Sequence, residues 1–159
     1  MKSDSDMRRP RGFTFLEMMV VLAIMAILAM ATAPVAHLIS QREKERELRA
    51  ALVEIRAALD AYKRAGDETR ISRPAGGSGY PPDLRTLVEG VPALSGDRIY
   101  FLRRIPKDPF ADPKLPTEKH WGLRSYASSA DHPSAGEDVY DVYSLTAGEA
   151  LDGTKYREW

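Results

Sequence analysis

Residues 12–30 read GFTFLEMMVVLAIMAILAM, and the uncharged run that begins at Met18 continues to Gln41. This run is longer than the ~20 residues that an α-helix needs to cross a bilayer, and its centre is apolar on all sides of a helix. Pro34 lies inside the run and is expected to weaken or kink the helix. The sequence therefore predicts a membrane-spanning helix over residues 13–41.

Glu17 is the anomaly of this stretch, because it places an acid at the mouth of the membrane segment. A carboxylate in lipid is costly unless another group pairs with it. Position alone leaves open an acid whose side chain reaches the cytoplasmic boundary and an acid that has a charged partner. Any account of the protein must explain this residue.

The head of the chain is basic. Residues 1–12 contain four cations and two acids, namely Lys2, Arg8, Arg9 and Arg11 against Asp4 and Asp6. Basic residues that flank a first membrane segment tend to remain in the cytoplasm, so residues 42–159 are expected outside it. An ordinary signal peptide, cleaved at small residues between Ala29 and Ala33, is an alternative interpretation.

Composition and length limit the partners, the cross-links and the number of domains that the chain can have. The 23 basic and 23 acidic residues balance, so bulk charge does not indicate a nucleic-acid partner. Cysteine is absent from the sequence, so no disulfide can stabilise an exported domain. Beyond the apolar run the chain is long enough for one modest domain, which an apolar core or a metal ion must hold together.

An amphipathic pattern continues past the apolar run, over residues 42–64. Its apolar positions recur at helical spacing: Leu48, Ala51, Leu52, Ile55, Ala58, Leu59 and Tyr62. The opposite face carries Arg49, Glu54, Arg56, Asp60 and Lys63, which we interpret as a solvated face. One helix is therefore predicted from about Phe13 to Ala65, ending near Gly66. The stripe is too short to favour a coiled coil, so we expect it to pack on its own domain.

The rest of the chain predicts short elements. A short helix is expected within residues 80–88, opened by proline and closed by Gly90. Strands are expected at residues 121–128 and 139–145, with a third at 155–159. The predicted fold class is α+β: a long N-terminal helix, half membrane and half amphipathic, packed on a small antiparallel sheet.

The stretch from Gly12 to Glu17 closely resembles the start of type IV pilin-like proteins. That family has a basic leader, a glycine, a phenylalanine, an acid at the fifth mature position and an apolar helix with a proline, here Pro34. The resemblance implies that a prepilin peptidase cuts between Gly12 and Phe13 and methylates the new amine. It also implies that Glu17 pairs with the Phe13 amine of a neighbouring subunit. The domains would then be a cleaved leader (1–12), a membrane and assembly segment (13–41) and a periplasmic domain (42–159).

Later motifs are similar to those of the major pseudopilin of type II secretion systems. The matches are Tyr80-Pro81, the Pro-x-Asp-Pro of residues 106–109, residues 140–145 (Tyr-Asp-Val-Tyr-Ser-Leu) and Trp159. Phe110 replaces the tryptophan that the family has after this second proline, and the Trp-Gly pair appears later at Trp121, as if residues 111–120 were inserted.

The resemblance implies a structural subunit of a periplasmic pseudopilus, which helps to push folded proteins across the outer membrane. Its partners would be copies of itself, minor pseudopilins, the inner-membrane assembly platform and the prepilin peptidase. No enzymatic activity is expected, because the sequence contains no phosphate-binding loop, Cys-x-x-Cys pair or nucleophile elbow. The alternatives are a type IV pilus subunit for adhesion, motility or DNA uptake, and an anchored periplasmic domain that never polymerises.

Four acids near the C-terminus are candidate calcium ligands: Asp138, Asp141, Glu149 and Asp152. Major pseudopilins bind calcium in this loop, and oxygen ligands suit that ion. The sequence departs from the family pattern near Gly148, where an expected aspartate is missing, so a solvated acidic loop is the alternative. The three histidines, His37, His120 and His132, are too scattered for a metal site and are expected to face solvent.

Overall fold

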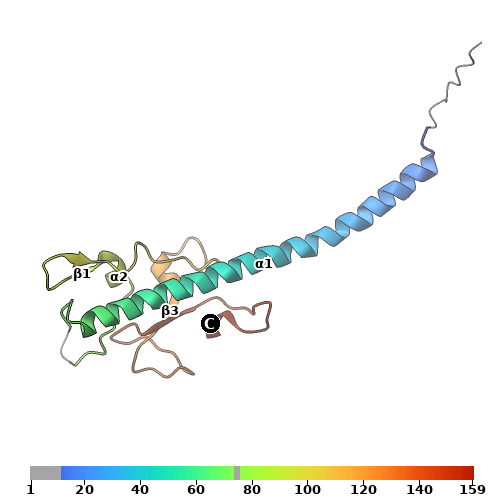
Figure 1. Ribbon diagram of the computed structural model, residues 1–159. Coiled ribbons are helices and arrows are strands. Elements are labelled where there is room, and N and C mark those ends of the chain that lie inside the picture. Colours follow the sequence, from blue (N-terminus) through green and yellow to red (C-terminus); the bar gives the residue numbers. More distant parts are fainter. Residues whose placement is uncertain (1–11, 74–75) are drawn as a thin grey trace, which may run out of the picture. The chain divides into compact units, whose positions relative to one another are not determined.

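The computed structural model describes residues 12–73 and 76–159; within its first helix the side chains of residues 31–35 are not described. The chain consists of two compact units, Met1–Ser40 and Gln41–Trp159. Helix α1, Phe15–Asp67, contributes residues to both units (Figure 1). Its bounds agree closely with the helix predicted from about Phe13 to Ala65.

Thr14 starts helix α1. Its side-chain Oγ1 accepts a hydrogen bond of 3.2 Å from the backbone N–H of Glu17, as a residue at a helix N-cap does. Glu17 itself lies in the first turn, where a negative charge is favourable. In the part of the chain that the structure describes, no helix is long and apolar enough to cross a membrane.

The second unit is built on the C-terminal half of α1. All seven residues of the predicted apolar stripe are buried, and Leu48, Ile55 and Leu59 are almost completely inaccessible to solvent. Each buried leucine or isoleucine contributes about 1.5–3 kcal/mol relative to exposure. The same core includes Leu87, Trp121 and other residues that follow the helix. The stripe prediction is confirmed.

A short helix and a hairpin cover one part of this core. Helix α2, Arg85–Glu89, ends at Gly90, whose positive φ of 72° favours glycine. Strands β1, Val91–Pro92, and β2, Arg98–Ile99, pair antiparallel directly after it. The hairpin was not predicted from the sequence, because its strands are only two residues long.

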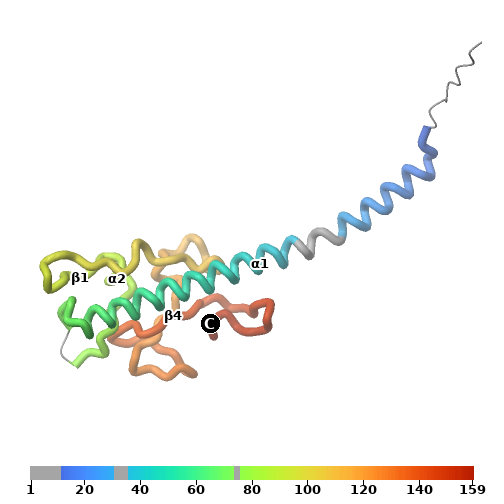
Figure 2. Tube along the Cα trace, in the orientation of Figure 1, coloured from blue at the N-terminus to red at the C-terminus, as the bar shows by residue number. Residues whose placement is uncertain are grey.

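A second pair of strands brings distant residues together. Strand β3, Trp121–Arg124, pairs antiparallel with β4, Asp141–Ser144, so that Trp121 lies opposite Ser144. Strand β4 lies beside α1, as Figure 2 shows, and Arg56 of the helix contacts Asp141 and Val142 of the strand. The described residues thus form two two-stranded sheets packed with a long helix, and the predicted α+β class is confirmed.

Two predictions about the C-terminal half were wrong. The expected third strand at 155–159 is instead a 3₁₀ helix, η2, Tyr156–Glu158, closed by hydrogen bonds such as Glu158 N–H to the Lys155 carbonyl. His120 was expected to face solvent, but it is buried at the end of a second 3₁₀ helix, η1, Thr117–His120. Its position immediately before the buried Trp121 draws it into the domain, where Nε2 lies 3.1 Å from the Leu115 carbonyl oxygen.

Candidate functional site

The N-terminal residues of the described chain are open to solvent. A methyl group added at Gly12 would meet no described atom within 4 Å, so packing inside this chain does not require glycine there. Phe13 is exposed, and so is Glu17. The side chain of Pro34, the remaining residue predicted to act in assembly, lies outside the described residues.

The helix that follows these residues exposes apolar side chains on all its faces. Within residues 13–30 the large apolar side chains left exposed are Phe13, Phe15, Leu16, Met18, Met19, Val20, Val21, Leu22, Ile24, Met25, Ile27, Leu28 and Met30. Soluble proteins rarely leave such a contiguous apolar surface uncovered, and one this large marks a site of interaction with protein or lipid. Glu17 is the acidic residue of this surface.

The family motifs found in the second unit contact one another. The Ser144 hydroxyl donates a hydrogen bond of 2.5 Å to the buried Asp108, and the indole N–H of Trp121 donates to the Pro106 carbonyl at 3.0 Å. Residues 111–120 therefore form an excursion that leaves this cluster and returns to it at Trp121. The tryptophan contacts the proline motif although the two are separated in sequence.

The first of these motifs joins the same unit from another side. The Pro81 carbonyl accepts a hydrogen bond of 2.8 Å from the Val139 N–H, and the Tyr80 ring packs edge-on against Tyr140 with centroids 5.0 Å apart. Phe110, which replaces the family's tryptophan, stacks on Tyr156 at 4.5 Å. The residues of these motifs thus pack together in the second unit.

The four candidate calcium ligands are not brought together. Among the described residues, no group of three or more histidine, cysteine, aspartate or glutamate side chains is placed to hold a metal ion. Both carboxylate oxygens of Asp141 accept hydrogen bonds from arginines, Arg56 at 2.7 Å and Arg124 at 3.2 Å. Asp138 accepts from the backbone N–H of Tyr126 at 2.8 Å.

The other two acids lie in the C-terminal loop. Asp152 accepts from Thr154 and from Arg49, at 2.9 Å for the arginine. These hydrogen bonds, the one from the Thr154 side chain first, hold the pKa of the Asp152 carboxyl below its usual value. Glu149 is exposed and pairs with Lys155 through an isolated backbone bridge. The donor set therefore does not fit a calcium ion, which needs about 6–8 oxygens around one point.

Helix residues that contact the C-terminal segment were missed, Arg56 and Glu45 among them. Arg56 was interpreted as part of a solvated face, but it also donates to the carbonyls of Val142 at 3.1 Å and Trp159 at 2.5 Å. Glu45 was not singled out, although it is buried. It falls three residues before Leu48 on the apolar stripe, and a carboxylate at that spacing was the signal that it has buried partners.

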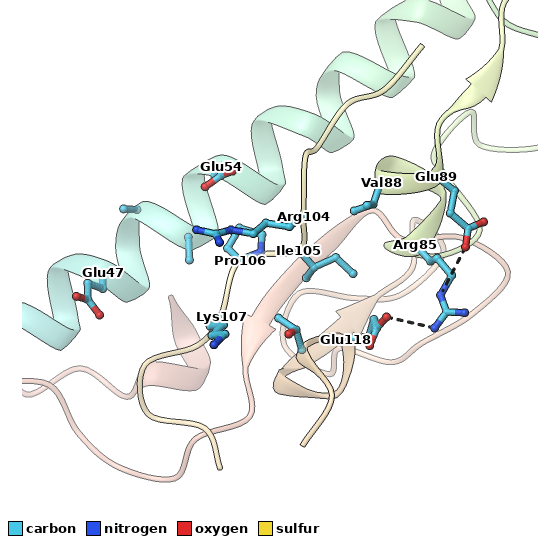
Figure 3. A pocket seen from close by; sticks show the side chains of 13 residues that line it. Glu47, Glu54, Arg85, Val88, Glu89, Arg104, Ile105, Pro106, Lys107 and Glu118 are labelled. Atoms are coloured by element: carbon cyan, nitrogen blue, oxygen red, sulfur yellow. Dashed lines mark hydrogen bonds and ion pairs between the residues drawn. The ribbon is translucent and has the colours of Figure 1, made fainter. Parts of the chain in front are cut away.

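A surface groove of about 710 Å³ lies between α1, α2 and residues 104–107 (Figure 3). At one edge Arg85 pairs with Glu118 at 3.2 Å, and it lies 3.9 Å from Glu89. The groove is lined by charged side chains of both signs and by apolar side chains that include Val88 and Ile105. Its described lining contains no histidine or cysteine.

Comparison with known proteins gives matches to a family model and to curated relatives. Residues 7–33 match the family model described as the prokaryotic N-terminal methylation motif. That motif, at the start of a long helix packed on small antiparallel sheets, defines the class of type IV pilin-like proteins. No solved structure gives a significant match.

Curated relatives narrow the class. The chain is 36% identical over 110 residues to the type II secretion system core protein G of Klebsiella pneumoniae, covering 65% of this chain and 71% of that protein. It is 35% identical over 112 residues to the Aeromonas hydrophila protein of the same name, with coverage of 67% and 71%. For the Klebsiella michiganensis protein the identity is 30% over 143 residues, with coverage of 81% and 90%. The chain belongs to the family of type II secretion system core protein G, the major pseudopilin.

Proposed function

We propose that this chain is a structural subunit of a periplasmic pseudopilus that helps to push folded proteins across the outer membrane in type II secretion. Before assembly it is anchored in the inner membrane by residues 13–41, with the leader in the cytoplasm and residues 42–159 in the periplasm. The observation that carries the proposal is the exposed surface of residues 13–30, where large apolar side chains lie on all faces of the helix and Glu17 is the acidic residue. Lipid covers such a surface before assembly, and neighbouring helices cover it afterwards.

Processing takes place at Gly12. The prepilin peptidase cuts between Gly12 and Phe13 and methylates the amine of Phe13. Two observations support this step: residues 7–33 match the N-terminal methylation motif, and Gly12 is exposed with no packing partner that demands glycine. Glycine at this position is then required for recognition by the peptidase and not for packing within the chain.

Assembly pairs the Glu17 carboxylate with the positively charged amine of Phe13 on the next subunit. Both charges are costly in an apolar bundle, and pairing offsets part of that cost. Each subunit has one such acid and one such amine, so the contact is heterologous and repeats into an open helix instead of closing. Among the described residues, no hydrogen bond or ion pair occupies the Glu17 side chain.

The subunit acts by assembling and has no catalytic role. Its partners are further copies, minor pseudopilins, the inner-membrane assembly platform and the peptidase. A type IV pilus subunit would share the N-terminal helix, but the curated relatives, which match about two thirds of this chain, are named as type II secretion proteins. A membrane-anchored domain that never polymerises would give Glu17 no partner.

The Glu17→Ala variant tests the assembly step. We expect it to be cleaved and inserted but to give no filaments by electron microscopy when the other secretion components are present. Thr14→Ala is the matched control: it removes the hydrogen bond to the Glu17 N–H but leaves the carboxylate, and we expect it to assemble. Normal filaments from Glu17→Ala would contradict the proposal. Equal defects in both variants would also count against it, because they would show that assembly depends on the start of helix α1 in general and not on the Glu17 carboxylate in particular.

A further inference from the structure

Glu45 is a buried carboxylate that faces the C-terminal loop. Its Oε1 accepts three hydrogen bonds: from the Leu151 backbone N–H at 2.9 Å, the Tyr156 hydroxyl at 3.0 Å and the Gln41 amide at 3.2 Å. Hydrogen bonds to an ionised acceptor are about twice as strong as neutral ones. Two of these donors come from residues more than a hundred positions away in the chain, so Glu45 joins the helix to this loop.

The loop is closed on itself where it meets Glu45. Ala150 N–H donates to the Thr154 carbonyl at 2.8 Å and Gly153 N–H to the Ala150 carbonyl at 2.9 Å. A backbone bridge between Glu149 and Lys155 brings the two ends together. Glu45 contacts this closed loop at Leu151 and again just past its end, at Tyr156, so one side chain fixes both parts of the segment.

Gln41 and Arg49, each one helical turn from Glu45 on α1, also contact the C-terminal segment. Gln41 Nε2 lies 3.1 Å from the Tyr156 hydroxyl, and Arg49 pairs with Asp152 at 2.9 Å while lying 4.1 Å from the centre of the Trp159 ring. Side chains four apart lie on the same side of a helix, so residues 41, 45 and 49 form a row along α1. The row presents an amide, a carboxylate and a guanidinium to the loop.

We propose that Glu45 performs in this chain the structural role that a calcium ion would perform: its carboxylate accepts hydrogen bonds from residues 149–156 and holds them on α1. A metal ion would organise such a loop by gathering its carboxylates. Here Asp141 and Asp152 are engaged by arginines, and the loop donates an N–H group and a hydroxyl to a helix carboxylate. The fold of the subunit is therefore independent of divalent cations, whether or not it forms filaments.

The test is thermal unfolding of the full chain in detergent micelles, followed by circular dichroism in calcium chloride and in EDTA. We expect the same Tm for the native chain in both. Glu45→Ala leaves a buried hydroxyl and a backbone N–H without their acceptor, and we expect Tm to fall by roughly 5–10 °C, with no recovery in calcium. Glu47→Ala, an exposed acid on the same helix, is the control and should leave Tm nearly unchanged.

Hydrogen exchange keeps the proposal falsifiable if Glu45→Ala does not fold. Glu45→Gln preserves the acceptor oxygen without its charge, and we expect faster exchange in residues 149–156 with little change in the core of α1. The proposal is overturned if EDTA lowers the Tm of the native chain by several degrees. It is equally overturned if calcium slows exchange in residues 149–156 of the native chain, or if Glu45→Ala and Glu47→Ala unfold at the same temperature.

Discussion

Ser144 donates a hydrogen bond of 2.5 Å to Asp108, and both residues are buried. The same carboxylate accepts from the backbone N–H of Phe110 at 2.8 Å and from the Thr146 hydroxyl at 3.3 Å. Asp108 thus holds the turn of residues 106–110 against the end of β4. The Pro-x-Asp-Pro motif of residues 106–109 and the motif of residues 140–145 therefore contact each other directly.

Removing the hydroxyl at this contact tests its contribution. We expect Ser144→Ala to lower the free energy of unfolding by about 1–3 kcal/mol, because a buried carboxylate oxygen loses its shorter donor. Ser95→Ala, at an exposed position in the β1–β2 turn, should change it by less than about 0.5 kcal/mol. The measurement is urea unfolding of the full chain in detergent. Equal effects of the two substitutions would show that the contact is not stabilising.

Two arginines of α1 that pair with C-terminal acids allow a matched comparison. Arg56 and Asp141 are 2.7 Å apart and partly buried, whereas Arg49 and Asp152 are 2.9 Å apart with both side chains at least half exposed. We expect Arg56→Met to cost about 1–2 kcal/mol of unfolding free energy, since Asp141, Val142 and Trp159 all lose a donor. Arg49→Met should cost less than about 1 kcal/mol.

Salt dependence separates these two pairs further. Exposed ion pairs are screened by added salt more strongly than partly buried ones. The cost of Arg49→Met should therefore shrink as salt is added, while the cost of Arg56→Met should persist. Denaturant midpoints for both variants at low and high salt provide this measurement. A larger cost for Arg49→Met than for Arg56→Met would contradict the expectation that the partly buried Arg56 contacts stabilise the domain more than the exposed Arg49 pair does.

Stability at alkaline pH follows from the buried tyrosines. Burial raises the pKa of Tyr62, Tyr80 and Tyr156 above the ordinary value of 10.0. Above about that pH the unfolded chain has lost its phenolic protons while the folded chain still holds them, so the free energy of unfolding falls as pH rises through this range. Near neutral pH all three hydroxyls are protonated in both states, so these groups do not make the free energy of unfolding depend on pH there.

A single substitution tests this pH dependence. Tyr62→Phe removes one ionisable group from the core, and we expect its Tm to fall less steeply with pH above about 10 than that of the native chain. Tyr100→Phe, at an exposed ring, should follow the native curve. Thermal unfolding across this pH range gives the comparison. If the native chain and Tyr62→Phe give the same slope, burial of the Tyr62 hydroxyl is not responsible for the loss of stability.

The long helix and its apolar stripe could be predicted from sequence because their signal is local. Helical spacing from Leu48 to Tyr62 requires no knowledge of partners, and Gly66 with Asp67 ends the pattern. The β1–β2 hairpin could not be predicted in the same way. Its strands contain two residues each, and their pairing depends on a turn whose Gly96 has a φ of 99°.

The site contacts were predicted less well, because they join residues that are far apart in the chain. The family resemblance made the acids of the C-terminal segment candidate calcium ligands, with a solvated loop as the alternative. In the structure the helix supplies partners for Asp141 and Asp152. Only the tertiary structure places Arg56 beside β4. Similarly, the aromatic residues Tyr156 and Trp159 favoured a strand by composition, but contacts with Phe110 and Arg49 accompany a 3₁₀ turn.

We propose above all that this chain is processed at Gly12 to give a subunit that assembles through Phe13 and Glu17. The most direct test is mass spectrometry of the N-terminal peptide from the full-length protein, produced in cells that contain a prepilin peptidase. We expect a mature chain that begins with N-methylated Phe13. A chain that retains Met1 and the leader in the presence of active peptidase would contradict it.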